Sequence, residues 1–532
     1  MSAKKEIKEL KFEELTTEQK IGMTMTAVCN RPKDTDVDFI EKLIKEHSLG
    51  ALWITPGADT DATLKRLKNA ADYPLLIICD AESGMAPHLI GKHNSVGMTD
   101  SEELAYMFGK VTAITARKRG YNVVCDPVID MTNGNATCNG TARSLGGDKY
   151  KVAKLASAIA RGMHDGGVLT VAKHYPGSSP EVDRTVDSHM AETTSPDTVE
   201  TLLEYNLYPY MELDRQGLLD GVMLRHGRYP NIDPDYPASL SKELIKIFRD
   251  QGFEGFAITD ALAMMGVVAK FGLKGGVGLS VANATDLALP WTKDNEDALS
   301  WIKEYYENGT ITPEKLDASV KRVLAAQHKV YAMLPKFDDV TEEDIATFNR
   351  INTDYIYAKI DEGLPTGLDR DGKYYFVVLK ETHAAVDESK PDVDTFRVPW
   401  YHPNKITERL KELFPNSIVD SIPDYPHSGQ VWKLLENSYG YETVFVTFYM
   451  GGAYCGEERF TPPLISLVNA MQVTNRISTV LHFGNPFVLE DFSHVSRVII
   501  GTGAELGVEA GLNVLAGKAP ANGVLTYDVK LK

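Results

Sequence analysis

The chain has 532 residues, too many for one compact core, so two or three domains are expected. Apolar residues make up 43% of it and charged residues 24%, as in ordinary soluble globular proteins. The 56 basic and 74 acidic residues give a net charge of −18, which argues against nucleic acid or an anionic membrane surface as a partner.

The N-terminus is charged and shows no apolar segment of a signal peptide. No stretch approaches the ~20 apolar residues that a membrane span needs. The five cysteines form no CxxC pair, and their odd number favours reduced thiols over a disulfide framework or a zinc site. We therefore expect a cytoplasmic protein that does not bind membranes, and the sequence is compatible with a homo-oligomer.

Over residues 1–331 the chain alternates short apolar runs with longer amphipathic stretches. This pattern is typical of buried parallel strands joined by crossover helices. Eight such units in about 310 residues predict a (β/α)8 TIM-type barrel, with irregular closure left open. The expected strands are residues 21–28, 50–55, 75–79, 122–125, 168–172, 221–224, 256–259 and 286–289. The clearest expected helices are residues 59–71, 101–119, 150–165, 241–251 and 312–331.

The rest of the chain predicts a second domain. Residues 332–371 are polar and contain several Gly, Pro and Asp residues, which predicts a helical linker. In residues 372–532 a new set of apolar runs predicts a C-terminal α/β sandwich around a largely parallel sheet. The expected strands of this domain are residues 374–379, 443–449, 478–482 and 498–501, and an edge strand over 524–529.

Polar residues gather where the expected barrel strands end. The carboxyl ends of barrel strands open onto one face, where TIM-barrel enzymes carry out their chemistry. Any one such residue is more often structural, but five strands that end this way are hard to explain by helix capping. After the third to the seventh strand stand, in order, Asp80, Asp126, Lys173 with His174, Arg225 with His226, and Asp260.

Two motifs on this face suggest acid–base chemistry. Asp260 directly follows an apolar strand, although an Asp there also suits a helix N-cap. In an extended segment, Asp187 and His189 point the same way, so Asp187 could orient the imidazole for proton transfer. A surface Asp–His pair without a role is the alternative. Together, however, a proton donor and an exposed carboxylate are the minimum equipment of a double-displacement glycosidase.

These motifs resemble those of glycoside hydrolase family three, and within it the β-N-acetylglucosaminidase branch. The similarity covers nearly the whole chain, including the expected second domain. It runs through residues 15–22 (LTTEQKIG), 173–177 (KHYPG), 187–189 (DSH), 237–241 (PASLS), 252–264 (GFEGFAITDALAM), 483–487 (FGNPF) and 517–520 (GKAP).

The resemblance implies a retaining exo-glycosidase for β-linked N-acetylglucosamine or a related small carbohydrate. It implies that Asp260 is the nucleophile and that His189, supported by Asp187, is the acid/base. The sugar-binding residues that it implies are Asp80, Arg143, Lys173, His174 and His226.

Several departures from the family pattern leave the substrate open. The family's DQEGGR run appears here as DAESGM over residues 80–85, and Ala261 replaces a second aspartate after the nucleophile. Arg225 and Arg228 stand where small or apolar residues are common, and could favour an anion. The alternatives are therefore a β-N-acetylglucosaminide or β-glucoside phosphorylase, a β-glucosidase or β-xylosidase, and a non-catalytic carbohydrate-binding relative.

No cofactor or metal is expected. The glycine run at residues 275–278 lacks the strand–turn–helix setting of a dinucleotide-binding motif. No His-x-His follows the first expected strand, so a metal-dependent barrel hydrolase is not supported.

Overall fold

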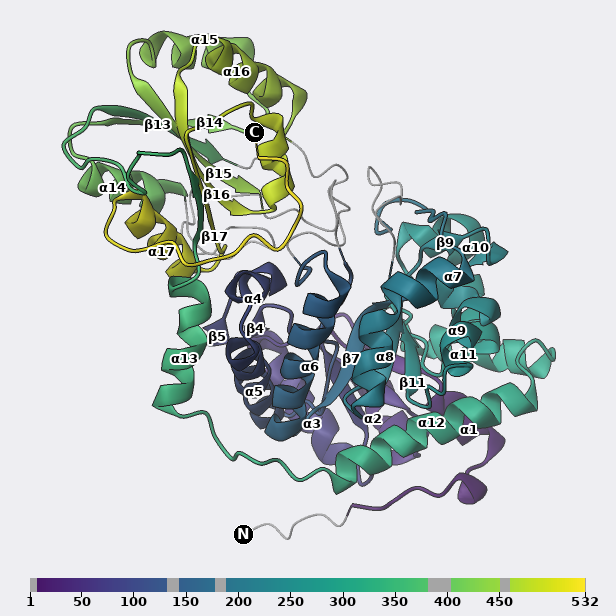
Figure 1. The fold of residues 1–532 in the computed structure, drawn as a ribbon. Coiled ribbons are helices and arrows are strands. Elements are labelled where there is room, and N and C mark those ends of the chain that lie inside the picture. The colour runs from purple at the N-terminus through teal and green to yellow at the C-terminus, as the bar shows by residue number, and fades with distance from the viewer. Residues whose placement is uncertain (1–6, 132–142, 178–187, 381–402, 450–459, 532) are drawn as a thin grey trace. The chain divides into compact units, whose positions relative to one another are not determined.

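The computed structural model describes residues 7–131, 143–177, 188–380, 403–449 and 460–531. The chain forms two compact units (Figure 1). Unit 1 comprises Met1–His88, Ala105–Met131 and Lys149–Glu342, and unit 2 comprises Leu89–Leu104, Thr132–Asp148 and Glu343–Lys532. Two segments from the N-terminal half of the sequence thus belong to unit 2. The predicted domain limits at residues 331 and 371 stay a prediction.

Unit 1 is built on a curled, seven-stranded parallel sheet in the order β1-β2-β3-β6-β7-β8-β11. Each strand is buried, because helices cover the outer face and side chains fill the interior. The strands are β1 Thr26–Val28, β2 Ala51–Trp53, β3 Leu76–Cys79, β6 Val123–Val124, β7 Leu169–Tyr175, β8 Gly221–Leu224 and β11 Phe256–Thr259.

The eighth expected strand, residues 286–289, forms only isolated bridges. Its backbone nevertheless bonds to both edges of the sheet. Thr26 N–H donates to Ala288 O at 2.9 Å on one side, and Thr259 N–H donates to Leu287 O at 3.2 Å on the other. Unit 1 is therefore a TIM-type domain whose last barrel segment is irregular.

Helices surround these strands (Figure 1). Those that follow the expected positions are α3 Ala58–Ala70, α5 Glu102–Arg119, α6 Lys149–Gly166, α9 Lys242–Arg249 and α12 Pro313–Ala332. The others around the barrel are α1 Thr17–Met23, α2 Val37–Lys45, α7 Val199–Thr201, α8 Tyr208–Arg215, α10 Met265–Leu279 and α11 Asn295–Glu307, with π-helical turns at Leu202–Asn206 and Ser280–Ala284.

Two of the expected barrel strands have different limits. Residues 21–23 belong to α1, because Thr16 and Gln19 form a capping box that starts a helix there. Their burial on the core side of that helix produced the apolar run that we interpreted as a strand. The fifth strand is longer than predicted and runs to Tyr175, so Lys173 and His174 lie within β7 rather than after it.

The helical segment Met265–Ala284 passes a length and composition test for membrane spans. Within the described residues, Met265–Ala284 is long and apolar enough to cross a membrane, so the expectation that no such stretch exists was wrong. The core helix of a globular protein passes the same test. Here the segment joins β11 to the eighth barrel segment, as a barrel crossover helix does.

Unit 2 contains a six-stranded sheet in the order β12-β17-β16-β15-β13-β14. All neighbours in it are parallel except the edge strand β12, which runs antiparallel to β17. The strands are β12 Tyr357–Ile360, β13 Tyr374–Lys380, β14 Ile418–Pro423, β15 Glu442–Tyr449, β16 Ile477–Gly484 and β17 Arg497–Gly501. This confirms the predicted largely parallel sheet.

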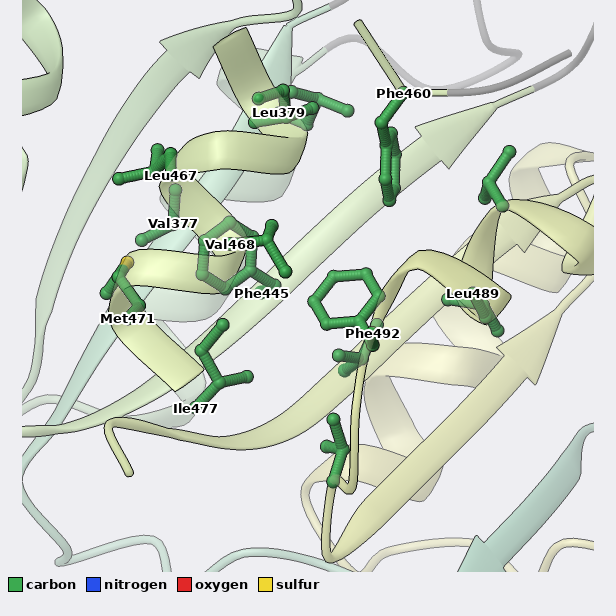
Figure 2. Close-up of a cluster of buried hydrophobic side chains, with 14 of the residues drawn as sticks. Val377, Leu379, Phe445, Phe460, Leu467, Val468, Met471, Ile477, Leu489 and Phe492 are labelled. Atoms are coloured by element: carbon green, nitrogen blue, oxygen red, sulfur yellow. The ribbon is translucent and has the colours of Figure 1, made fainter. Parts of the chain in front are cut away.

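Helices cover both faces of the sheet of unit 2 (Figure 1), so the predicted sandwich is also confirmed. α15 and α16 pack on one face, where Phe445, Leu467 and Phe492 belong to one buried cluster (Figure 2). α14 and α17 pack on the other face. The helices of this unit include α4 His93–Thr99, α13 Glu342–Thr353, α14 Pro403–Leu413, α15 Ser428–Asn437, α16 Pro462–Val473 and α17 Glu505–Leu515.

The predicted edge strand over residues 524–529 was wrong. Its backbone joins no sheet, and Val524 N–H donates instead to Met98 O at 3.0 Å. Tyr527 contributes a side-chain bond, in which its hydroxyl donates to Ser144 O at 2.7 Å. The alternation of apolar residues reflects packing against Phe487, with which Tyr527 and Val529 form a buried cluster, and the sheet edges are β12 and β14.

Candidate active site

Asp260 is the first residue after β11 and is half-buried. Its own N–H donates to Leu224 O at 2.9 Å, which holds it beside the end of β8. Its Oδ1 accepts a hydrogen bond from the N–H of Ala261 at 2.7 Å. The N-cap residue of the following helix α10 is Met264, so Asp260 does not cap that helix.

Three imidazoles influence the charge of Asp260. Burial raises the pKa of its carboxyl, but His174, His226 and His189, with the Ala261 N–H, more than offset this and hold the pKa at about 2. The Nε2 atom of His174 lies 3.9 Å from Asp260 Oδ2. Asp260 is therefore ionised at neutral pH, as a carboxylate nucleophile must be.

His226 is fully buried behind Asp260, and both of its ring nitrogens contact protein atoms. Nε2 lies 2.9 Å from Ala261 O, and Nδ1 lies 2.8 Å from Ser239 Oγ. Because a carbonyl only accepts, Nε2 carries the proton and Nδ1 accepts from the hydroxyl. Burial lowers the pKa of His226, which favours this neutral ring. This geometry suits a residue that fixes the backbone at Ala261, directly after Asp260. The predicted contact of His226 with sugar stays a prediction.

Lys173 brings together two carboxylates from the segment after β3. Its ammonium group is almost fully buried, lies 2.7 Å from Glu82 Oε1 and contacts Asp80. Glu82 is buried, whereas about half of the Asp80 side chain is exposed. Asp80 can therefore accept hydrogen bonds from a ligand while Lys173 holds it in place.

His189 approaches the site through its backbone. Its carbonyl accepts from Met265 N–H at 3.2 Å, and the carbonyl of Ser188 accepts from Gly266 N–H at 2.9 Å. These bonds tie the His189 loop to the start of α10, just after Asp260. The side chain is half-buried, and its charge lowers the pKa of Asp260. Its predicted partner Asp187 lies outside the described residues.

The predicted role of Arg143 is untested, and Arg228 is engaged by other protein groups. Arg143 belongs to unit 2, and its predicted contact with sugar stays a prediction. Arg228, which could favour an anion, is already engaged: its guanidinium lies 2.9 Å from Glu192 Oε1 and also donates to Pro234 O. Among the residues that the structure describes, no group of three or more His, Cys, Asp or Glu side chains could hold a metal ion.

Three residues of the site were missed in the sequence. Asp130 contacts His174, Glu82 pairs with Lys173, and Ser239 orients His226. Glu82 could have been found from its place in the DAESGM run, two residues after Asp80. Asp130 follows the apolar run 127–129 after the fourth strand, which is a weaker signal of the same kind. Ser239 lies in the PASLS run at residues 237–241, a motif of the family resemblance, but nothing in that run indicates its contact with His226.

The chain is similar to known glycoside hydrolases. The sequence profile of the glycosyl hydrolase family 3 N-terminal domain matches residues 9–326. The chain is 28% identical over 311 residues to Beta-hexosaminidase LpqI of Mycobacterium tuberculosis, covering 54% of this chain and 78% of that protein. It is 25% identical over 331 residues to Beta-N-acetylglucosaminidase/beta-glucosidase of Cellulomonas fimi, covering 59% of this chain and 57% of that one.

Solved structures extend the similarity to both units. A glycoside hydrolase family 3 beta-N-acetylglucosaminidase from Paenibacillus sp. str. FPU-7 covers 97% of this chain and 100% of its own, with a TM-score of 0.79 and 25% identity. Beta-glucoside phosphorylase BglX has a TM-score of 0.78 at 21% identity, covers 97% of this chain and 94% of its own, and shares the fold. The profile match spans more than half of the sequence, and the chain therefore belongs to glycosyl hydrolase family 3 and is a glycoside hydrolase.

Proposed function

We propose that this glycoside hydrolase is a retaining exo-glycosidase that releases β-linked N-acetylglucosamine, or a related sugar, by double displacement. The observation that carries the proposal is the ionised carboxylate of Asp260, which lies at a strand end among three imidazoles. An acid with a pKa of about 2 is a poor proton donor at neutral pH, so this group suits attack on an anomeric carbon.

In the first step, the Asp260 carboxylate attacks the anomeric carbon while the bond to the leaving oxygen breaks. His189 donates its proton to that oxygen, and a covalent glycosyl–Asp260 intermediate forms. In the second step, His189 takes a proton from water as the water oxygen attacks the same carbon. The sugar leaves with retained configuration, and Asp260 is again a carboxylate.

Asp80 and Lys173 are proposed to bind the hydroxyl groups of the sugar. A half-exposed carboxylate accepts hydrogen bonds from adjacent hydroxyls, and the buried ammonium group of Lys173 keeps it oriented. His174 is proposed to contact the sugar through Nε2, on the side of the ring that faces Asp260. The names of the relatives support N-acetylglucosamine as the sugar, with glucose as the next candidate.

The main alternative to a hydrolase is a phosphorylase, because the proposed acid/base is a histidine. An imidazole that has lost its proton is neutral and repels an incoming phosphate less than a carboxylate would. Of the two arginines that could favour an anion, Arg228 is already bound by Glu192 and Pro234 O, and Arg225 is buried. The balance of these observations supports water as the acceptor.

A panel of aryl β-glycosides tests the proposal. The N-acetylglucosaminide, glucoside and xyloside are assayed with and without inorganic phosphate, and the products are separated. We expect the free sugar from the N-acetylglucosaminide, at a rate that phosphate does not change. Formation of the sugar 1-phosphate would show a phosphorylase instead. Binding of sugars without turnover of any glycoside would show a non-catalytic relative.

A further inference from the structure

Asp130 lies on a segment whose backbone is hydrogen-bonded to β7 at Lys173, next to the candidate active site. Ile129 N–H donates to Lys173 O at 2.8 Å, and Lys173 N–H donates to Pro127 O at 3.1 Å. These backbone bonds bring the buried carboxylate of Asp130 to His174, although 44 positions separate the two residues in the chain. The backbone bonds therefore place the Asp130 carboxylate beside the His174 ring.

The Asp130 carboxylate contacts His174 twice. Its Oδ2 accepts a hydrogen bond from the backbone N–H of His174 at 3.3 Å and lies 2.6 Å from the ring Nδ1. An ionised carboxylate only accepts, so the proton between these two atoms belongs to Nδ1. The other ring nitrogen, Nε2, is then the one that faces Asp260, with Oδ2 at 3.9 Å.

We infer that Asp130 is a positioning residue for the nucleophile: it fixes the His174 ring with a proton on Nδ1 and so presents Nε2 to Asp260. The inference rests on the proposed role of Asp260 as nucleophile. A ring turned over about its Cβ–Cγ bond would present a carbon atom to the carboxylate and lose the bond to Asp130. Asp130 acts through His174 and is not itself a catalytic residue.

The electrostatics of the site agree with this arrangement. Burial has the largest effect on the pKa of Asp260 and raises it, and among the influences that lower it His174 is the largest. The effects of His226 and His189 are smaller. His174, the ring that Asp130 contacts, therefore lowers the pKa of Asp260 more than either other imidazole does.

Two substitutions at position 130 test the inference. Asp130→Ala removes the acceptor for Nδ1–H, whereas Asp130→Asn keeps an acceptor of nearly the same shape. We measure kcat on the best aryl glycoside and the rate at which an activated 2-fluoro sugar inactivates the enzyme. A misplaced group at a reacting centre can cost about 100-fold in rate, so we expect a loss of up to roughly that size for alanine and a smaller one for asparagine. Wild-type rates in Asp130→Ala would overturn the inference.

A double-mutant cycle separates a positioning role from a structural one. If Asp130 acts through His174, then Asp130→Ala costs much less in a His174→Gln background than in the wild-type enzyme. Equal losses in both backgrounds would show that Asp130 acts independently of the ring, and would overturn the inference.

The protonation of His174 can also be measured in the wild-type protein, so this test does not depend on whether a variant at position 130 folds. Nitrogen-15 NMR of labelled histidines, with His174 assigned by its absence in His174→Gln, reports which ring nitrogen is protonated. We expect a proton on Nδ1 of His174. A ring protonated on Nε2 alone would overturn the inference.

Asp220→Asn is the matched control. Asp220 is another buried carboxylate next to a histidine, with Oδ2 at 2.7 Å from His164 Nε2, but it lies at the opposite, N-terminal end of β8. We expect this variant to lower the unfolding temperature and leave the activity per folded molecule unchanged. Turnover that survives Asp260→Ala would refute the proposed function itself. If Asp260→Ala is inactive and Asp130→Ala behaves as wild type, only the inference about Asp130 fails.

Discussion

His226 donates a hydrogen bond through Nε2 to the carbonyl of Ala261, 2.9 Å away, and so holds the residue that follows the proposed nucleophile. Its other nitrogen meets Ser239 Oγ at 2.8 Å, so the ring has one orientation. The Ala261 N–H in turn donates to Asp260 Oδ1. A buried chain from Ser239 to Asp260 thus orients the carboxylate before any substrate binds.

We expect His226→Phe to lower kcat by roughly 10- to 100-fold, since Phe keeps the volume but leaves the Ala261 carbonyl without its donor. The free energy of unfolding should fall by about 1–3 kcal/mol, the cost of one buried unsatisfied polar group. Steady-state kinetics and urea unfolding measure the two effects. A variant with wild-type kcat would show that the hydrogen bond from His226 to Ala261 is not needed to orient Asp260.

Removal of the nucleophile should abolish turnover. We expect Asp260→Ala to lose on the order of 10⁴-fold or more in kcat, as when a reacting group of another enzyme is removed. Wild-type enzyme treated with a 2-fluoro sugar should carry the adduct on the peptide that contains Asp260, as mass spectrometry would show. Asp235→Ala, at an exposed carboxylate after β9 Arg228–Tyr229, is the control and should keep full activity. An adduct on another carboxylate would refute the assignment.

The depressed pKa of Asp260 predicts how the first step depends on pH. With its pKa near 2 rather than the ordinary 3.8, the carboxyl stays ionised well into the acid range. The inactivation rate with an activated 2-fluoro sugar, whose leaving group needs no proton, should therefore stay constant from pH 7 to about pH 4. Circular dichroism at each pH checks that the protein is folded. A rate that already halves at pH 4 would contradict the assigned pKa.

The same shift has a consequence for stability. A carboxyl whose pKa is lower in the folded state stabilises the fold above its unfolded pKa. This contribution should be present above pH 3.8 and disappear as the pH falls toward 2. The difference in unfolding free energy between wild type and Asp260→Asn, measured along this pH range, should shrink toward the acid end.

Glu82 should matter for substrate binding. In Glu82→Gln, Lys173 keeps a neighbour of the same shape but loses one of its two negative charges. We expect the ammonium group to draw closer to Asp80 and compete with sugar hydroxyls for that carboxylate, which raises KM roughly 10-fold with a smaller change in kcat. Glu212→Gln, which alters the exposed pair with Arg215, is the control. A higher KM in both variants would indicate a nonspecific effect.

Asp286 is predicted to stabilise the N-terminal end of the barrel. Its buried carboxylate accepts from Ala257 N–H and Arg249 Nη2, both at 2.9 Å, and lies 3.3 Å from Arg322 Nη1. Asp286→Ala leaves these cations without their common anion, and we expect a loss of about 3–5 kcal/mol in unfolding free energy. Activity per folded molecule should not change. Denaturant unfolding of this variant and of the surface variant Asp250→Ala provides the comparison.

Local patterns in the sequence were enough to predict most of the elements. Parallel strands are buried on both faces, so they appear as short apolar runs whatever their neighbours are. The same property explains the errors, because the buried side of α1 and the packed tail at residues 524–529 are apolar for other reasons. The eighth barrel segment was expected, but its weak bridging to both neighbours depends on how the sheet closes.

For the site, the sequence determined which polar groups stand at the strand ends. Asp260, Lys173, His174 and Asp80 each follow or end an apolar run, and this pattern is local. Only the tertiary structure decided which groups serve them. Asp130 meets His174, Glu82 meets Lys173, and Ser239 meets His226 across different strands. Hydrogen bonds act over about 3 Å in space without regard to distance along the chain, so the sequence does not show which residue each of these partners meets.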